Sequence, residues 1–204
     1  MADEWQRVQE AVFPCLLAPG TQGDPAERER DWATEGIQTH AQPLITEGPC
    51  GLLVGFTLMA TGFDVLVNAQ HLHDWAIGAD DLALAAGKNL GAWSDGAEWA
   101  DEASGAHRLR SSETGSGHDA ARILLPQVRQ DICAELSRGA PVGTRILVGL
   151  PDRDLLVAGA LHPGDTEFAG LFRDFVMEHS SSADQPIDRR IFELQGDDLV
   201  EYAG

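Results

Sequence analysis

Two apolar segments near the middle of the chain constrain the fold most strongly. Residues 144–150 (TRILVGL) and 154–161 (DLLVAGAL) are separated only by the short charged turn that begins at Pro151. Almost every position in both is apolar, which is typical of central strands buried on both faces. We therefore expect Leu147, Val148, Leu156 and Val157 in the core of a sheet that helices cover on both sides.

The remaining pattern predicts an α+β fold. Two further hairpins are expected, one joining residues 51–60 to 63–68 and one joining residues 189–194 to 199–204 through Gly196. Residues 92–112 read as a pair of weak strands or a loop. Helical periodicity or capping signals mark the segments 2–17, 71–75, 80–93, from Ser116 onward, and 165–179. The sequence thus predicts a single domain over residues 1–204, an antiparallel sheet covered by helices, with a mobile surface loop at 18–36.

Two of these helices carry specific expectations. Ser116 and Asp119 have the spacing of a capping box, followed by an apolar stripe that includes Val128, Ile132 and Leu136. Pro126 should kink or restart that helix, and Ile123 lies off the stripe. In the helix 165–179 the predicted buried residues are Phe168, Leu171, Phe172, Phe175 and Val176. Ser180 to Ser182 resemble a flexible tail.

The charge balance excludes several classes of partner. The chain has 33 acidic and 14 basic residues, a net charge of -19. Such a field repels nucleic acid and anionic lipid, so we expect no direct binding to either, and no apolar run is long enough to cross a bilayer. The acidic amphipathic start of the chain predicts no export signal and hence a cytoplasmic protein. The three cysteines, Cys15, Cys50 and Cys133, form no CxxC pair and are interpreted as buried thiols that pack as small hydrophobic side chains.

Three short motifs resemble a bacterial conserved-hypothetical family, a domain of unknown function. They are AGKNL at 86–90, GHDAARIL at 117–124 and LPDRDLL at 150–156. They are similar to that family's A-x-x-N-L, G-x-D-A-[SA]-R-I-L and V-P-x-x-D-x-L motifs in the same order, with Leu150 in place of the valine, within a similar region of about 56–161. The resemblance implies a cytoplasmic α+β protein of unassigned role and supplies no catalytic residues. From the sequence we expect the longer N-terminal region of the family's better-known members to be missing.

A candidate polar cluster follows from the same segments. Asp119 and Arg122 lie three residues apart near a predicted helix start, and Arg153 and Asp154 lie in the charged turn. A structural interpretation suffices for each pair, as a helical side-chain pair and as a plain turn. If helix and turn meet, the four side chains could instead recognise a ligand or perform acid-base chemistry. We expect Arg122 to hold Asp154 across that gap, which would require the planar guanidinium.

Other chemistries have weaker support. His71 and His73 would share a face in a strand, but Trp75 favours a helix, which points them apart, and no second ligand cluster is present. We therefore expect no metal and no cofactor. Ser116 lacks a nucleophile-elbow frame. An acidic run at 98–102 contains Trp99 and follows Trp93, and this segment could contact another protein.

These observations favour a non-enzymatic protein-binding or adaptor module whose acidic surface engages another protein. Two alternatives stay open: a hydrolase-type enzyme that uses Asp119, Arg122, Arg153 and Asp154, and an acidic immunity protein that mimics nucleic acid. A deep pocket at the four residues would favour an enzyme, and an exposed Trp-containing apolar patch would favour an adaptor. Whether the protein is an enzyme, its partner and its oligomeric state are not fixed by the sequence.

Overall fold

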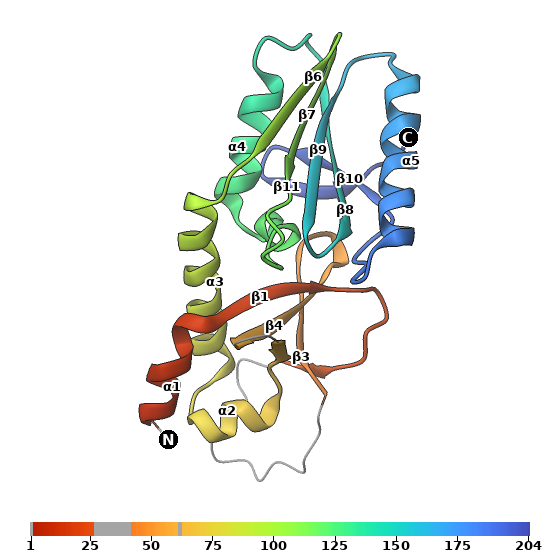
Figure 1. Ribbon diagram of the computed structural model, residues 1–204. Helices are drawn as coiled ribbons and strands as arrows, with labels where there is room; N and C mark the ends of the chain where they lie inside the picture. Colours follow the sequence, from red (N-terminus) through yellow and green to blue (C-terminus); the bar gives the residue numbers. More distant parts are fainter. Residues whose placement is uncertain (1, 27–41, 61–62) are drawn as a thin grey trace. The chain divides into compact units, whose positions relative to one another are not determined.

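The computed structural model describes residues 2–26, 42–60 and 63–204, and its helices and mostly antiparallel sheets confirm the α+β class (Figure 1). The contacts divide the chain into two compact units. Unit 1 comprises residues 1–48 and 52–96, and unit 2 comprises residues 49–51 and 97–204. The expected count of one domain stays a prediction, and each unit is described by itself.

In its described residues, unit 1 combines a small sheet with three α-helices. The helices are α1 (Ala2–Val8), α2 (Ala69–Trp75) and α3 (Ala79–Gly96), with a short 3-10 helix η1 (Gln9–Ala11). The strands are β1 (Val12–Leu17), β2 (Asp24–Pro25), β3 (Leu44–Glu47), β4 (Leu53–Ala60) and β5 (Phe63–Leu66). β4 is the centre of the sheet and pairs antiparallel with β1, β3 and β5. Its pairing with β5 confirms the first predicted hairpin.

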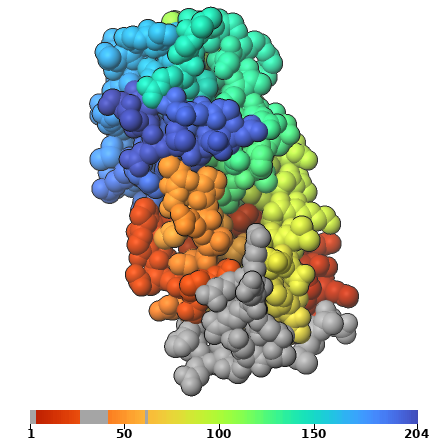
Figure 2. Space-filling model, turned by 180° about the vertical axis from the view of Figure 1, so that it is seen from behind, coloured from red at the N-terminus to blue at the C-terminus, as the bar shows by residue number. Residues whose placement is uncertain are grey.

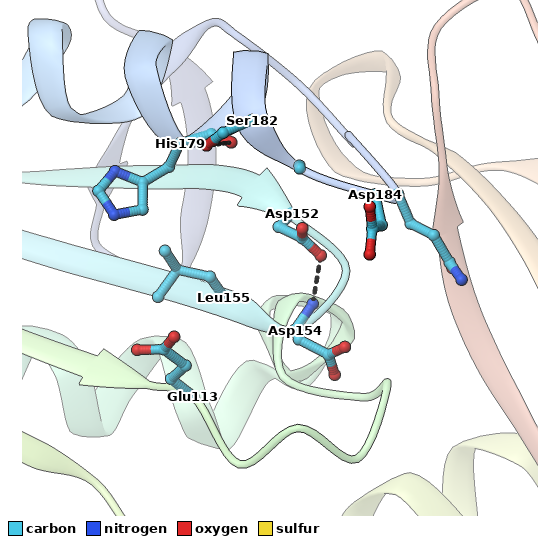
Figure 3. A pocket seen from close by; sticks show the side chains of 9 residues that line it. Glu113, Asp152, Asp154, Leu155, His179, Ser182 and Asp184 are labelled. Carbon is cyan, nitrogen blue, oxygen red and sulfur yellow. Dashed lines mark hydrogen bonds between the residues drawn. The ribbon is translucent and has the colours of Figure 1, made fainter.

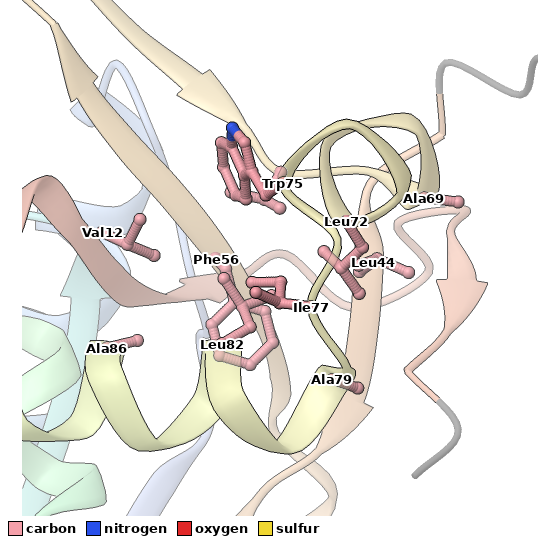
Figure 4. Packing of buried hydrophobic residues seen from close by; sticks show 11 residues of the cluster. Val12, Leu44, Phe56, Ala69, Leu72, Trp75, Ile77, Ala79, Leu82 and Ala86 are labelled. Carbon is pink, nitrogen blue, oxygen red and sulfur yellow. The ribbon is translucent and has the colours of Figure 1, made fainter. Parts of the chain in front are cut away.

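The core of unit 1 forms where α2 and α3 pack against the sheet (Figure 4). It contains side chains from both helices and from three strands, among them Val12, Leu44, Phe56, Leu72 and Leu82. Asn89 ties α3 to the start of β1, since its side-chain amide donates to the carbonyls of Gln9 at 2.7 Å and Val12 at 2.8 Å. The Asn of the AGKNL motif thus has a structural role.

The N-terminal helix is much shorter than expected. The helical spacing of Trp5, Val8, Val12 and Cys15 predicts one helix over residues 2–17, but α1 ends at Val8 and residues 12–17 form β1. β1 pairs along its whole length with β4, from Val12 opposite Leu58 to Leu17 opposite Leu53. Long-range pairing therefore overrides the local periodicity. Most of the predicted loop 18–36 lies outside the described residues.

Unit 2 is built on a sheet of six strands in the order β11-β10-β8-β9-β7-β6, antiparallel throughout. The strands are β6 (Ala100–Ser104), β7 (His107–Ser112), β8 (Arg145–Asp152), β9 (Leu155–Leu161), β10 (Ile191–Gln195) and β11 (Asp198–Glu201). The helices are α4 (Pro126–Ser137) and α5 (Thr166–Ser182), with 3-10 helices η2 (Pro49–Gly51) and η3 (Ala120–Leu124). The last hairpin, β10–β11, is confirmed and lies on the face of the unit seen in Figure 2 (dark blue).

The two central strands are covered on both faces, as predicted. Leu147 and Val157 face α5 and pack with Phe168, Phe172 and Val176. α4 also contacts β8 and β9, and Val148 and Leu156 are fully buried on the alternate positions. Figure 1 shows α4 and α5 on opposite sides of these strands. The expected core residues Leu147, Val148, Leu156 and Val157 are all confirmed as buried.

The segment after Ser116 differs from its prediction. No α-helix starts there, because residues 120–124 form the 3-10 helix η3 and α4 starts at Pro126. Pro126 thus restarts the helix at its first turn, where a missing N–H costs nothing. The capping box is wrong: the Asp119 side chain binds Ser112 and Thr114. Ile123, predicted to lie off the buried stripe, is fully buried.

Two expectations for α5 also need correction. Leu171 is 56% exposed, because the buried face follows Phe168, Phe172 and Val176 at intervals of four residues. The helix continues through Ser182, so Ser180 to Ser182 are helical and Ser180 is buried. Serines tolerate the last turn because their hydroxyls bind carbonyls one turn earlier, as Ser181 does with Met177 at 2.7 Å.

Candidate functional site

Asp119 and Arg122 are joined by the hydroxyl of Ser112, at the end of β7. Ser112 Oγ donates to Asp119 Oδ1 at 2.5 Å and accepts from Arg122 Nη1 at 2.7 Å. Thr114 Oγ1 donates to Asp119 Oδ2 at 2.8 Å. Asp119 and Ser112 are 0% exposed and Arg122 is 2% exposed. This part of the predicted cluster is a buried hydrogen-bonded network that a substrate does not reach.

The Arg122 guanidinium lies over the aromatic ring of Trp99. Its central carbon lies 4.0 Å from the ring centroid of Trp99, and that of Arg110 lies 4.7 Å from the same ring. Burial lowers the pKa of Arg122 below its ordinary value, while Asp119 acts in the opposite direction. Trp99 therefore stabilises two cations by cation-π contact. It is half-buried, and its place in a protein-contact patch stays a prediction.

Arg153 and Asp154 bind the backbone of the loop that leads to Asp119. The Gly117 amide donates to Asp154 Oδ1, and Arg153 Nε donates to the Gly117 carbonyl at 2.8 Å. The amide of Ala120 donates to the Arg153 carbonyl at 3.1 Å. Gly117 has a φ of +80°, and a Cβ there would lie 2.5 Å from Arg153 Nη2. Glycine is therefore required where the turn and the loop meet.

The structure brings the four predicted residues into the same region through two different sets of contacts. Asp119 and Arg122 bind the Ser112 hydroxyl, whereas Arg153 and Asp154 bind the main chain of Gly117. These hydrogen bonds account for both pairs as structural clamps. The expected direct pairing of Arg122 with Asp154 stays a prediction.

An open pocket of about 370 Å³ lies beside this region, between the turn after β8 and the end of α5 (Figure 3). Four carboxylates and one imidazole contribute to its lining, together with smaller side chains. The lining residues are Glu113, Asp152, Asp154, Leu155, His179, Ser182, Ala183, Asp184 and Gln185. No Lys or Arg belongs to this set. We call it the acidic pocket.

Nearly all polar atoms of the acidic pocket are hydrogen-bond acceptors. His179 Nδ1 lies 2.9 Å from the Phe175 carbonyl, which can only accept, so Nδ1 carries the proton and Nε2 of the neutral ring is an acceptor. Ser182 Oγ donates to the carbonyls of Glu178 and His179, at 3.1 and 3.2 Å. Its proton is therefore directed into the helix, and no base in these contacts activates it as a nucleophile.

Two of the four carboxylates in the acidic pocket, those of Glu113 and Asp184, are available to a ligand. Asp152 accepts from the Asp154 amide at 3.0 Å (dashed in Figure 3), and Asp154 accepts from Gly117. Glu113 and Asp184 make no hydrogen bond or ion pair with any residue in the described ranges. The pocket also lies at the C-terminal end of α5, where the helix dipole favours a cation.

Sequence reasoning predicts part of this pocket and misses the rest. Asp152 and Asp154 belong to the charged turn that the sequence marks. Glu113, His179 and Asp184 are isolated polar residues with no shared spacing, so no local pattern relates them. Only the packing of α5 against β8 and β9 brings them together.

The histidine pair has a structural explanation. The segment 69–75 is α2, as predicted, with Asn68 as its N-cap. Asn68 Oδ1 accepts from the His71 amide at 3.2 Å, and His71 Nδ1 accepts from the Asn68 amide at 3.1 Å. Burial lowers the pKa of His71, which keeps this nitrogen an acceptor. Among the described residues, no three His, Cys, Asp or Glu side chains are grouped to hold a metal ion.

No protein-family model, curated protein or solved structure matches this chain. No helix in the ranges 2–26, 42–60 and 63–204 is long and apolar enough to span a membrane. What the fold and the site define is therefore a class: an acidic α+β protein with an acceptor-rich pocket at the end of a helix.

Proposed function

We propose that this chain is a non-enzymatic protein-binding module whose acidic pocket takes a basic side chain of its partner. The observation that carries the proposal is the chemistry of the lining: four carboxylates, with no lysine or arginine among the lining residues. An arginine or lysine head group is a cluster of N–H donors with one positive charge. It complements such a lining in both charge and hydrogen bonding.

The size of the pocket agrees with a side chain as occupant. About 370 Å³ is near the lower end of the roughly 300–1,000 Å³ typical of small-ligand sites. The net charge of -19 adds long-range attraction for a basic partner and speeds its association. We propose a cytoplasmic location for this interaction.

Binding is favoured over the hydrolase alternative by the positions of the polar groups. Asp119 and Arg122 are buried, and Ser182 donates its proton to helix carbonyls. A hydrolase requires a nucleophile or an activated water next to an acid-base group that the substrate can reach. The described hydrogen bonds of Asp119, Arg122 and Ser182 are made within the protein and stabilise the fold instead.

The test is a titration of the isotope-labelled protein with a blocked arginine, N-acetyl-arginine N-methylamide, followed by NMR. The citrulline analogue, which has a similar shape but no charge, is the ligand control. We expect saturable shifts of the His179 and Asp184 amides with the arginine probe alone. The double variant E113Q/D184N should bind the probe about tenfold more weakly, because two uncompensated charges are removed.

The matched control variant is E167Q/D174N, which changes the net charge equally at exposed positions outside the pocket. It should bind like the wild type. Equal weakening in both double variants would mean that only the overall field matters, and the proposal would fail. With a partner captured from the native cell, binding should be lost in E113Q/D184N and retained in E167Q/D174N.

A further inference from the structure

We infer that unit 2 has a second binding site, of opposite character, for a small anion with an apolar body. It is an open pocket of about 350 Å³ at the other end of α5. Its lining combines segments from β8, β9, the first turns of α5 and the C-terminal segment. The residues are Gly143, Arg145, Leu161, His162, Pro163, Gly164, Asp165, Thr166, Ala169, Gly170, Arg173, Tyr202 and Gly204. We call it the arginine pocket.

Two arginines in one pocket are unusual for this chain, which has only 14 basic residues and a net charge of -19. Many of the other arginines hold the fold together: Arg122 and Arg153 bind internal polar groups, and Arg190 binds Asp188. Arg173 is exposed and makes no hydrogen bond or ion pair with any residue in the described part of the chain. Its planar group is therefore available for two-pronged binding of a carboxylate or phosphate.

Arg145 is a preorganised second cation. Its Nε donates to Glu193 Oε1 at 3.0 Å, its Nη2 donates to Glu193 Oε2, and its central carbon lies 4.5 Å from the Tyr202 ring centroid. Nη1 is not used in this pair, so it can donate to a ligand. Fixing the side chain in advance reduces the entropy lost on binding.

Asp165, the acidic residue in the lining, already has two hydrogen-bond partners. Asp165 accepts from the Phe168 amide at 3.0 Å and lies 2.9 Å from His107 Nε2. Its charge is therefore used to cap α5 and to hold His107 rather than to repel an anion with a free carboxylate. The helix N-terminus adds a partial positive charge to that of Arg145 and Arg173.

The remaining lining explains why the ligand should carry an apolar body. Leu161, Pro163 and Ala169 contribute hydrocarbon surface, and Tyr202 contributes a ring. Figure 2 shows the C-terminal segment (dark blue) beside α5 (lighter blue) on the surface of unit 2. A site of about 350 Å³ exceeds what an inorganic anion fills, so an aromatic or aliphatic carboxylate or phosphate ester fits it better.

The experiment titrates the full chain with phenyl phosphate, benzoate and uncharged benzamide, observed by NMR at the Thr166 and Gly170 amides. Any purification tag is placed at the N-terminus, because Gly204 lines the pocket. We expect saturable shifts with at least one of the two anions and none with benzamide. Comparing the two anions decides between phosphate and carboxylate.

The test variant is Arg173→Gln, and the matched control is Arg189→Gln, an exposed arginine outside the pocket. R173Q should weaken anion binding about tenfold, because a charged two-pronged contact is lost, and R189Q should leave it unchanged. Equal weakening in both variants, equal binding of benzamide, or no saturable shift with either anion up to about 10 mM, a level that detects even millimolar affinity, would overturn the inference. The outcome is independent of the acidic pocket, whose variants lie at the other end of α5.

Discussion

Arg122 and Asp119 share one hydroxyl group, that of Ser112, which donates to the carboxylate at 2.5 Å and accepts from the guanidinium at 2.7 Å. All three residues are buried. A buried carboxylate and a buried guanidinium both need hydrogen-bond partners, because unsatisfied charges in a protein interior are costly. The Ser112 side chain satisfies one bond of each.

Replacing Ser112 with Ala should therefore destabilise the protein by about 2–4 kcal/mol, because two hydrogen bonds to buried charged groups are lost together. Urea unfolding measures the free energy. The matched control is Ser111→Ala on the same strand, which should change stability by less than about 0.5 kcal/mol. Similar losses for both variants would show that the shared hydroxyl has no special energetic role.

Replacing Arg122 with Lys should also destabilise, by about 2–4 kcal/mol, although the charge is kept. A lysine cannot both reach Ser112 Oγ as the guanidinium does and lie flat at 4.0 Å from the Trp99 ring. Urea unfolding, with the change in Trp fluorescence as signal, is the measurement. Arg189→Lys is the exposed control, and a value for R122K within about 0.5 kcal/mol of that control would contradict the prediction.

Gly149 lies under α5, where a side chain has no room. A Cβ at this position would lie 2.4 Å from Val176 Cγ2 and 3.1 Å from Val157 Cγ1. Gly149→Ala should cost about 1–3 kcal/mol through overpacking. Gly170→Ala, where a Cβ meets nothing within 4 Å, should be neutral or stabilise α5 by up to about 1 kcal/mol. Thermal unfolding should thus occur at a lower temperature in G149A than in G170A, and a G149A variant as stable as G170A would be a contradiction.

Sequence reasoning places an element correctly where a continuous run of apolar residues predicts that the element is buried. β8 and β9 are apolar at nearly every position, and each of the two confirmed hairpins pairs strands that follow one another closely in the sequence. The errors have a common physical cause, which is competition from distant partners. Residues 12–17 keep a helical spacing but pair with β4, and Asp119 has capping spacing but binds Ser112.

The same holds for the candidate sites: residues that share a local pattern can be predicted, and residues that only the fold brings together cannot. Asp152 and Asp154 are recognisable because they occupy one turn, and Arg122 because it belongs to a motif. The arginine pocket depends on Arg145 and Arg173, which are distant in the sequence and become neighbours of one cavity only when α5 packs on the sheet. Spacing along the chain carries no information about such a cavity.

Asp165 should make the stability of the protein depend on pH in the acidic range. Its pKa is lowered from the ordinary 3.8, chiefly by the hydrogen bond from the Phe168 amide and further by His107. A carboxyl group with a lowered pKa in the folded state stabilises the protein above its ordinary pKa, and this contribution is lost as the pH falls below 3.8 through the folded-state value. Asp165→Asn keeps a side chain that can cap α5 but removes the charge.

The wild type should therefore be more stable than D165N near pH 6, and the difference should shrink towards zero as the pH is lowered further and further below 3.8. Urea midpoints measured at several pH values in constant salt give this difference directly. Asp174→Asn, an exposed carboxylate on the same helix, is the matched control and should show a small difference at every pH. If the D165N difference were constant across this range, the charge of Asp165 would not be what stabilises the start of α5, and its contact with His107 would be only geometric.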